Sequence, residues 1–221
     1  MSFRIVLFVL TPYRKLMPDI AGYEHLTEPD PAHAMLLPVV LGALGRGAVD
    51  RRVFELGCGN GAFAEGLERL GWVVTGVDPS TSGIAYANAC RPKLDLHEGS
   101  AYDDLAGRFG RFPYVISLEV VEHVYAPREY VRTLFDLTAP GGTIVVSTPY
   151  HGYTKNLALA ITGALDRHFT ALWDHGHIKF WSIATLTELL TAAGFVNLHF
   201  RRVGRIPLLA KSMVVTATRP G

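Results

Sequence analysis

Glu119, Glu122 and His123 are the residues of this chain whose types and spacing most clearly suggest chemistry. Separations of three and four residues place their side chains on one face of a helical turn. Two carboxylates and an imidazole can bind a divalent cation, and the imidazole of His123 can serve as a general base. The alternative is that the acids cap the next helix and pair with Arg128 or Arg132, as exposed carboxylates commonly do.

A glycine-rich segment lies upstream, where Val-Phe-Glu-Leu at 53–56 is followed by Gly-Cys-Gly-Asn-Gly at 57–61. Glycines at a strand-to-helix junction let the backbone approach a ligand closely while helical N–H groups face it. Gly57, Gly59 and Ala62 also satisfy the pattern G-x-G-x-x-G/A. Alone, these residues therefore fit a nicotinamide dinucleotide, S-adenosylmethionine or a tight structural turn.

Two acids narrow the choice of ligand. Asp78 ends the strand predicted at 72–77, where a carboxylate can accept hydrogen bonds from both hydroxyls of a ribose. Glu55 stands two residues before the first glycine and can meet an ammonium group directly or through water. A nicotinamide site has less use for that acid, and no Tyr-x-x-x-Lys follows the glycines, so an oxidoreductase is disfavoured.

The elements that must position these residues alternate between short apolar runs and helical patterns, which predicts an α/β fold with a doubly wound sheet. Strands are predicted at 53–56, 72–77, 93–97, 114–118, 143–147, 196–202 and 213–218. Helices are predicted at 32–44, 62–70, 83–89, 128–137 and 183–193. The first strand is followed by the glycine segment, the second by Asp78 and the fourth by Glu119.

Composition limits the class of protein. The 221 residues suit one compact domain, and 21 basic against 20 acidic side chains give a net charge of +1, which argues against a nucleic-acid partner. Cys58 and Cys90 are too few for a disulfide scaffold or a four-thiolate zinc site. The longest uncharged apolar runs, 5–13 and 156–165, are shorter than the roughly 20 residues that span a bilayer. We therefore expect a cytoplasmic protein without a transmembrane span.

Over roughly residues 35–218 the sequence resembles the class I S-adenosylmethionine-dependent methyltransferases, through Glu55-x-Gly57-x-Gly59-x-Gly61, Asp78 and the Ala139-Pro140-Gly141-Gly142 turn. The resemblance implies a Rossmann-like sheet of seven strands with an antiparallel last strand, helices on both faces and S-adenosylmethionine at the carboxyl ends of strands one, two and four. The cofactor contacts that it implies are Glu55, Gly57, Cys58, Gly59, Gly61, Asp78, Pro79, Ser100, Ala101 and Leu118.

Two positions depart from the pattern of that family. Ser100 stands where many relatives have an Asp near the adenine, and Pro113 replaces the usual Asp before strand four. The Glu119-x-x-Glu122-His123 block more narrowly resembles the ubiquinone-biosynthesis O-methyltransferase family. That resemblance implies magnesium at Glu119, Glu122 and His123. A similar block in small-RNA 2′-O-methyltransferases is completed by a further histidine, for which the candidates are His151, His175 and His177.

Residues 149–181 form an insertion that a minimal sheet does not need, with an apolar stretch at 156–165 followed by Phe169 and Trp173. The same place in the ubiquinone family holds a comparable segment associated with membrane lipid. The stretch at 156–173 could make a peripheral membrane contact, cover the substrate pocket, or pack on the domain or at a dimer contact.

Together these features predict one methyltransferase domain: an N-terminal segment or lid at 1–50, a cofactor-binding core at 51–148, the insertion at 149–181, and a helix and hairpin at 182–221. The expected activity is O-methylation of a small aromatic or lipid-tailed molecule by in-line methyl transfer, with Glu119, Glu122 and His123 as catalytic residues. The alternatives are an RNA 2′-O-methyltransferase, another small-molecule N- or C-methyltransferase, and a non-catalytic cofactor-binding module.

Overall fold

The computed structural model describes residues 31–45, 47–169, 171–173 and 176–221. The apolar run at 5–13 and the part of the expected lid within 1–30 lie outside these residues, and so does His175. Within the described part, no helix is both long and apolar enough to pass through a membrane.

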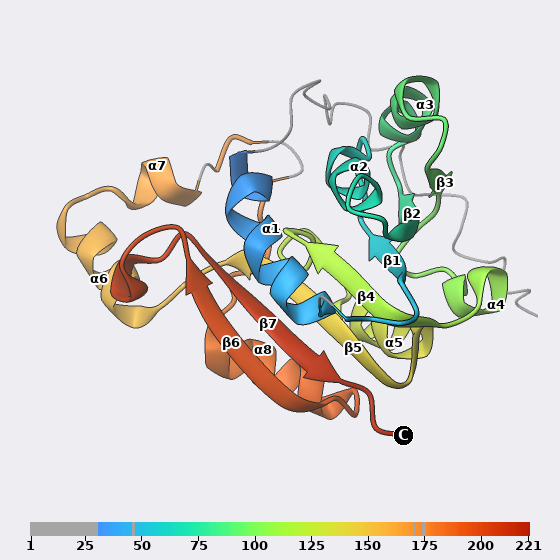
Figure 1. Cartoon of the computed structure of the whole chain (residues 1–221). Coiled ribbons are helices and arrows are strands. Elements are labelled where there is room, and N and C mark those ends of the chain that lie inside the picture. The colour runs from blue at the N-terminus through green and yellow to red at the C-terminus, as the bar shows by residue number, and fades with distance from the viewer. Residues whose placement is uncertain (1–30, 46, 170, 174–175) are drawn as a thin grey trace, which may run out of the picture.

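Seven strands form one mixed sheet in the order β3-β2-β1-β4-β5-β7-β6 (Figure 1). Neighbours from β3 to β5 pair in parallel, whereas β7 pairs antiparallel with β5 and with β6. The strands are β1 (Arg52–Leu56), β2 (Val73–Asp78), β3 (Asp95–Glu98), β4 (Phe112–Leu118), β5 (Thr138–Pro149), β6 (Val196–Val203) and β7 (Ser212–Thr218). The predicted fold class, with its antiparallel last strand, is confirmed.

β5 begins earlier than the predicted start at 143. The N–H of Gly141 donates to the carbonyl of Arg219 at 2.9 Å, and the N–H of Arg219 donates to the carbonyl of Gly142 at 2.9 Å. These bonds hold the 139–142 segment against the C-terminal end of the chain, so this segment belongs to the strand instead of only preceding it.

Helices cover both faces of the sheet (Figure 1). They are α1 (Pro31–Leu44), α2 (Ala62–Glu68), α3 (Thr81–Cys90), α4 (Leu105–Phe109), α5 (Pro127–Leu137), α6 (Tyr153–Ile161), α7 (Leu165–Phe169) and α8 (Ile183–Ala192), with a short 3-10 helix, η2 (Pro207–Leu209). α1, α2 and α3 share one buried apolar cluster with the sheet, and α4, α5 and α8 share the other. Within the described residues, α6 and α7 contribute to neither cluster.

The parallel register brings three strand ends to one edge of the sheet. Leu56 at the end of β1 pairs with Val77, next to the last residue of β2, and Glu55 pairs with Ile116 in β4. The loops that follow β1, β2 and β4 therefore leave the sheet side by side. The glycine segment, Asp78 and the acid-histidine block lie on these loops or at these ends, which is where open α/β sheets bind ligands.

Leu134 of α5 is fully buried among core side chains, because the apolar residues of this helix recur at helical spacing on its inner face. Leu134→Ala should lower the free energy of unfolding by about 2–5 kcal/mol through the lost contacts and the cavity left behind. Urea unfolding measures this change. Arg132→Ala, at an exposed position of the same helix, should change stability by no more than about 0.5 kcal/mol; an equal effect of both variants would contradict the packing described.

Candidate active site

The glycine loop crosses the end of β2. The N–H groups of Gly57 and Cys58 both donate to the carbonyl of Val77, at 2.8 and 3.0 Å. Gly57 has a φ of 85°, and a Cβ built on it would lie 2.4 Å from Cγ2 of Val120 in the loop after β4. Glycine is therefore required here both for its backbone conformation and for the close approach of the two loops.

Asp78 is fixed by both neighbouring loops. Its Oδ2 accepts a hydrogen bond from the N–H of Gly59 at 2.9 Å, and its Oδ1 accepts one from the N–H of Ser80 at 2.9 Å. The carboxylate is only half-buried, so a hydroxyl of a bound ligand can approach it. This geometry supports the predicted role of Asp78 at a ribose.

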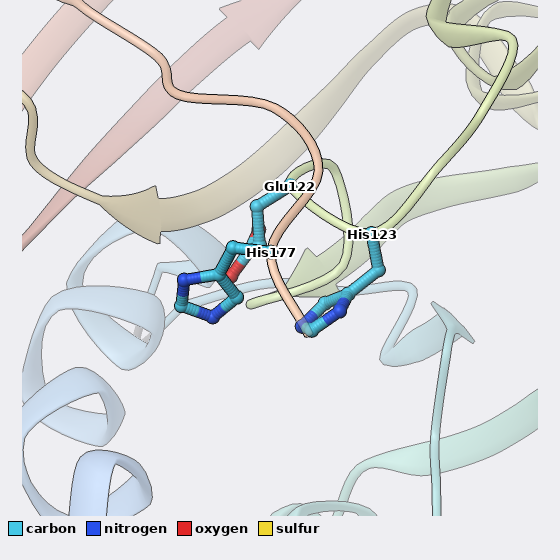
Figure 2. A group of neighbouring side chains, drawn as sticks. All are labelled: Glu122, His123 and His177. Atoms are coloured by element: carbon cyan, nitrogen blue, oxygen red, sulfur yellow. The ribbon is translucent and has the colours of Figure 1, made fainter. Parts of the chain in front are cut away.

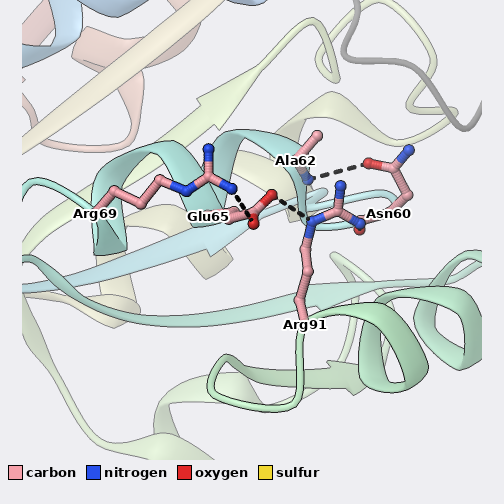
Figure 3. Close-up of polar contacts among 5 residues, drawn as sticks. All are labelled: Asn60, Ala62, Glu65, Arg69 and Arg91. Atoms are coloured by element: carbon pink, nitrogen blue, oxygen red, sulfur yellow. Dashed lines mark hydrogen bonds and ion pairs between the residues drawn. The ribbon is translucent and has the colours of Figure 1, made fainter.

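A polar network behind the loop ties α2 to the end of α3 (Figure 3). Arg91 forms an ion pair with Glu65 at 3.0 Å and donates to the carbonyl of Asn60 at 3.0 Å, while Asn60 Oδ1 accepts from the N–H of Ala62 at 3.0 Å. Arg69 also pairs with Glu65, at 2.5 Å. The network fixes the exit of the glycine loop into α2, so the loop's N–H groups keep their direction.

Glu55 is buried at the end of β1, and its Oε2 has no hydrogen-bond partner among the described residues. Burial raises the pKa of Glu55 to about 8, and the negative charge of Asp78 adds to the increase. A buried carboxyl without a partner favours the arrival of a cation. Glu55 is thus suited to the ammonium group that the sequence predicted for it.

The other predicted cofactor contacts fall at the same edge of the sheet. Cys58 and Leu118 are buried in the cluster that also contains α2 and α3, whereas Pro79 is exposed beside Asp78. Ser100 and Ala101 are half-buried after β3. Ser100 is engaged within its own turn, because its N–H donates to Asp103 Oδ2 at 2.9 Å and its Oγ accepts from the N–H of Tyr102 at 3.2 Å.

The acid-histidine block is not helical. Residues 121–123 form a turn, in which the N–H of His123 donates to the carbonyl of Val120 at 2.9 Å, and Glu119 has a φ of 55°. The prediction of one helical face is therefore wrong. The side chain of Glu119 instead accepts a hydrogen bond from Ser147 Oγ of β5 at 2.8 Å, with Ser212 Oγ of β7 at 3.4 Å from its other oxygen.

Glu122, His123 and His177 converge (Figure 2), and their candidate ligand atoms all lie within 4.8 Å of one another. The imidazole rings of His123 and His177 are 4.9 Å apart between centroids. The N–H groups of Ile178 and Lys179 donate to the carbonyl of Glu122, at 2.9 and 3.0 Å. These two bonds hold the end of the insertion against the turn and bring His177 to the site.

His177 is the member of this group whose place the sequence could not decide. It was one of three candidates for a further histidine, and no local pattern separates it from the others. In the structure, His151 packs instead against His168 and Phe180, at centroid distances of 5.4 and 5.0 Å. The hydrogen bonds from the N–H groups of residues 178 and 179 to the carbonyl of Glu122 are what bring His177 to the site, and they are seen only in the folded structure.

Without a bound cation, burial disfavours the charged forms of both Glu122 and His177. Burial raises the pKa of Glu122 well above its ordinary value, and the negative charge of Glu119 adds to the increase. Neither carboxylate oxygen of Glu122 has a hydrogen-bond partner among the described residues. Burial lowers the pKa of His177 to about 4, with further contributions from the charges of His123 and His168. A neutral imidazole and a carboxylate that lacks a partner are ready-made ligands for a metal ion.

The chain is similar to known methyltransferases. Residues 31–200 match the model of the methyltransferase domain family. A ubiquinone biosynthesis O-methyltransferase of Azorhizobium caulinodans is 35% identical over 65% of this chain and 58% of its own length. A protein of the same name from Psychrobacter arcticus is 31% identical, over 76% of this chain and 70% of its own length.

Among solved structures, an S-adenosylmethionine-dependent methyltransferase from Mesorhizobium loti superposes with a TM-score of 0.62 at 18% identity, covering 83% of this chain and 97% of that one. The fold and site define the class of S-adenosylmethionine-dependent methyltransferases. The chain belongs to the methyltransferase domain family. It spans about three fifths of the Azorhizobium relative's length.

Replacing Asp78 tests the cofactor end of the site. Asp78→Asn keeps one carbonyl oxygen for the loop N–H groups but removes the charge and one acceptor, so the affinity for S-adenosylhomocysteine should fall by about tenfold or more. Isothermal titration calorimetry measures it. Asp136→Asn, an exposed change on α5, should leave the affinity unchanged. Equal affinities of Asp78→Asn and wild type would remove Asp78 from the binding site.

The buried carboxyl of Glu55 should make stability depend on pH. Because its pKa in the folded state lies near 8, above the ordinary value of 4.5, its favourable contribution is complete below pH 4.5 and is lost as the pH rises through 8. Relative to Glu55→Gln, the ligand-free wild type should lose about 3 kcal/mol of unfolding free energy between pH 5 and pH 8. Parallel pH profiles of the two proteins in urea unfolding would show that Glu55 is not protonated on folding.

Proposed function

We propose that this protein is an O-methyltransferase that transfers the methyl group of S-adenosylmethionine to a hydroxyl of a small aromatic molecule with an apolar tail. The observation that carries the proposal is the convergence of Glu122, His123 and His177 beside the glycine loop, whose Gly57 packs against Val120. The names of the two relatives, which are ubiquinone biosynthesis O-methyltransferases, support the same chemistry.

The reaction needs alignment and the removal of one proton. The acceptor oxygen attacks the methyl carbon in line with the C–S bond of the sulfonium, whose electron pair stays on sulfur, so the products are a methyl ether and S-adenosylhomocysteine. The imidazole of His123 is half-buried and takes the hydroxyl proton. Glu55 and Asp78 hold the ammonium and the ribose of the methyl donor, which fixes the direction of attack.

A divalent cation fits the site. Glu122 and His177 would hold it, with His123 beside them as the base, because the oxygens of Glu122 are buried without partners among the described residues and the pKa of His177 is lowered. Glu119 is not a member of this group, since Ser147 binds its carboxylate. A bound cation would lower the pKa of the acceptor hydroxyl and orient a neighbouring oxygen. Two neighbouring imidazoles suit zinc better than the magnesium expected from the sequence.

The insertion supports contact with lipid. Tyr153, Leu157 and Ile161 recur every four residues along α6 and are 91%, 62% and 76% exposed, so this face does not pack on the domain. Leu172 and Trp173 after α7 are also exposed. An exposed apolar face of this kind suits a peripheral membrane contact through 156–173. A tailed acceptor would then enter the site from the membrane surface.

The proposed activity predicts a separation of binding from catalysis. His123→Ala should bind S-adenosylhomocysteine as the wild type does but methylate 4-alkylcatechols about 100-fold more slowly or worse, because the base is lost. Release of S-adenosylhomocysteine and mass spectrometry of the product measure the transfer. His199→Ala, an exposed change on β6, is the control. Transfer to amines but to no hydroxyl compound, or undiminished transfer by His123→Ala, would refute the proposal.

The membrane contact has its own test. Leu157→Ser combined with Ile161→Ser should reduce binding to phosphatidylglycerol-containing vesicles by about tenfold or more, because each side chain would lose on the order of 2 kcal/mol of burial. Co-sedimentation measures the bound fraction. Ala160→Ser changes a small exposed residue of the same helix and should leave binding unaltered. Equal sedimentation of the double variant and the wild type would argue against this contact.

A further inference from the structure

A hollow of about 430 Å³ lies between α6, α7 and the loop that joins β6 to β7. Four basic side chains line it: Lys155, His168, Arg205 and Lys211. The remaining described residues of its wall are apolar or carry a hydroxyl, and no carboxylate is among them. The ion pairs formed within the described part of the chain include none of these four side chains. The hollow is therefore a cluster of basic side chains that no carboxylate of its own wall neutralises, and Glu119 is the acidic group that acts on it, through Lys155.

Lys155 is the most informative of the four. It is only 9% exposed, and its Nζ makes one hydrogen bond within the described residues, to the carbonyl of Tyr150 at 2.9 Å. Burial lowers the pKa of Lys155 and the charge of Arg205 lowers it further, while the negative charge of Glu119 offsets part of the decrease. A buried ammonium is costly without an anionic partner, and two of its three N–H groups remain available for one.

His168 adds a second polar group without a partner. Its Nε2 is buried and has no hydrogen-bond partner within the described residues. Burial lowers the pKa of His168, as do the charges of Lys155 and Arg205. The imidazole can therefore donate an N–H to an anion in its neutral form, or share a proton with that anion. An anion in this hollow would relieve the mutual repulsion of all these groups at once.

The hollow adjoins the catalytic group. Lys211 precedes Ser212, whose Oγ is 3.4 Å from Glu119 Oε2, and the carbonyl of Lys211 accepts the N–H of Tyr150 at 2.9 Å. On the other side, the ring of His168 is 5.4 Å from that of His151, and His168 acts electrostatically on His177. His168, and Glu119 through Ser212, thus link the hollow to the Glu122-His123-His177 group, because each acts electrostatically on one of its members.

We propose that Lys155, His168, Arg205 and Lys211 bind an anionic group, a carboxylate or a phosphate, carried by the methyl acceptor. The inference rests on the proposed function, because it assumes that the acceptor lies at the Glu122-His123-His177 group. It adds that recognition requires two features of one molecule, a hydroxyl at the catalytic group and a negative charge in the hollow. Such a subsite would favour acceptors that carry the charge over neutral phenols that carry only the hydroxyl.

The test compares matched ligands by calorimetry with the protein saturated in S-adenosylhomocysteine. Catechol is compared with 3,4-dihydroxyphenylacetate and 3,4-dihydroxyphenylpropionate, which carry a carboxylate on tethers of different length, and with inorganic phosphate alone. At least one of the two carboxylates should bind about tenfold tighter than catechol, as expected for charge-assisted hydrogen bonds. Millimolar phosphate should bind in its own right and abolish that preference.

The variant is Arg205→Gln combined with Lys211→Gln, because both side chains are exposed and their loss should not disturb folding. It should lose the preference for the carboxylates and the binding of phosphate but keep its affinity for catechol. Arg201→Gln on β6 is the matched control and should behave as the wild type.

Three outcomes would overturn the inference: equal binding of catechol and both carboxylates, a preference that survives in the variant, or phosphate binding that the carboxylates do not share. The last would mean an anion site that serves something other than the acceptor. Failure of methyl transfer to hydroxyl compounds is a separate result, because all of these measurements are made without turnover.

Discussion

The two hydrogen bonds from Gly57 and Cys58 to the carbonyl of Val77 are the contact on which the site depends. They fold the loop after β1 across the end of β2, so that the N–H of Gly59 reaches Asp78. They also bring the backbone of Gly57 against Val120, at the start of the turn that carries Glu122 and His123. The cofactor loop and the acid-histidine turn are therefore positioned by one another.

A second constraint is the burial of two carboxyl groups in the site. Glu55 and Glu122 are each buried with at least one oxygen that lacks a partner in the described structure, and burial raises the pKa of both. Buried carboxyls of this kind reduce stability unless a cation arrives. Their two positions match the two positive charges that a metal-assisted methyl transfer would bring, the ammonium of the methyl donor at Glu55 and a divalent ion at Glu122.

Much of the cofactor-binding part of the site could be predicted from the sequence, because its residues stand next to recognisable strands. Gly57, Gly59 and Asp78 follow directly after strands that hydrophobic patterning identifies, and parallel strand ends meet at one edge of a sheet. The doubly wound fold followed from the same alternation of strands and helices.

The acceptor half could be predicted only in part. A separation of three and four residues is compatible with a helix or a turn, and the positive φ of Glu119 that decides for a turn has no sequence signal in a glutamate. His177 reaches Glu122 through backbone bonds between segments more than fifty residues apart, which no local pattern encodes. The cationic hollow likewise combines α6, α7 and the β6–β7 loop, and its charges are scattered along the chain.

We expect Glu122 and His177 to hold one cation that serves the acceptor, beside His123 as the base. Electron paramagnetic resonance of Mn²⁺ titrated into the S-adenosylhomocysteine complex tests it most directly, with magnesium and zinc as competitors. We expect one bound ion per chain, lost in Glu122→Gln and in His177→Ala but retained in Glu188→Gln, an exposed change on α8. A wild-type protein that leaves Mn²⁺ free in solution, or binding that survives the loss of Glu122, would contradict it.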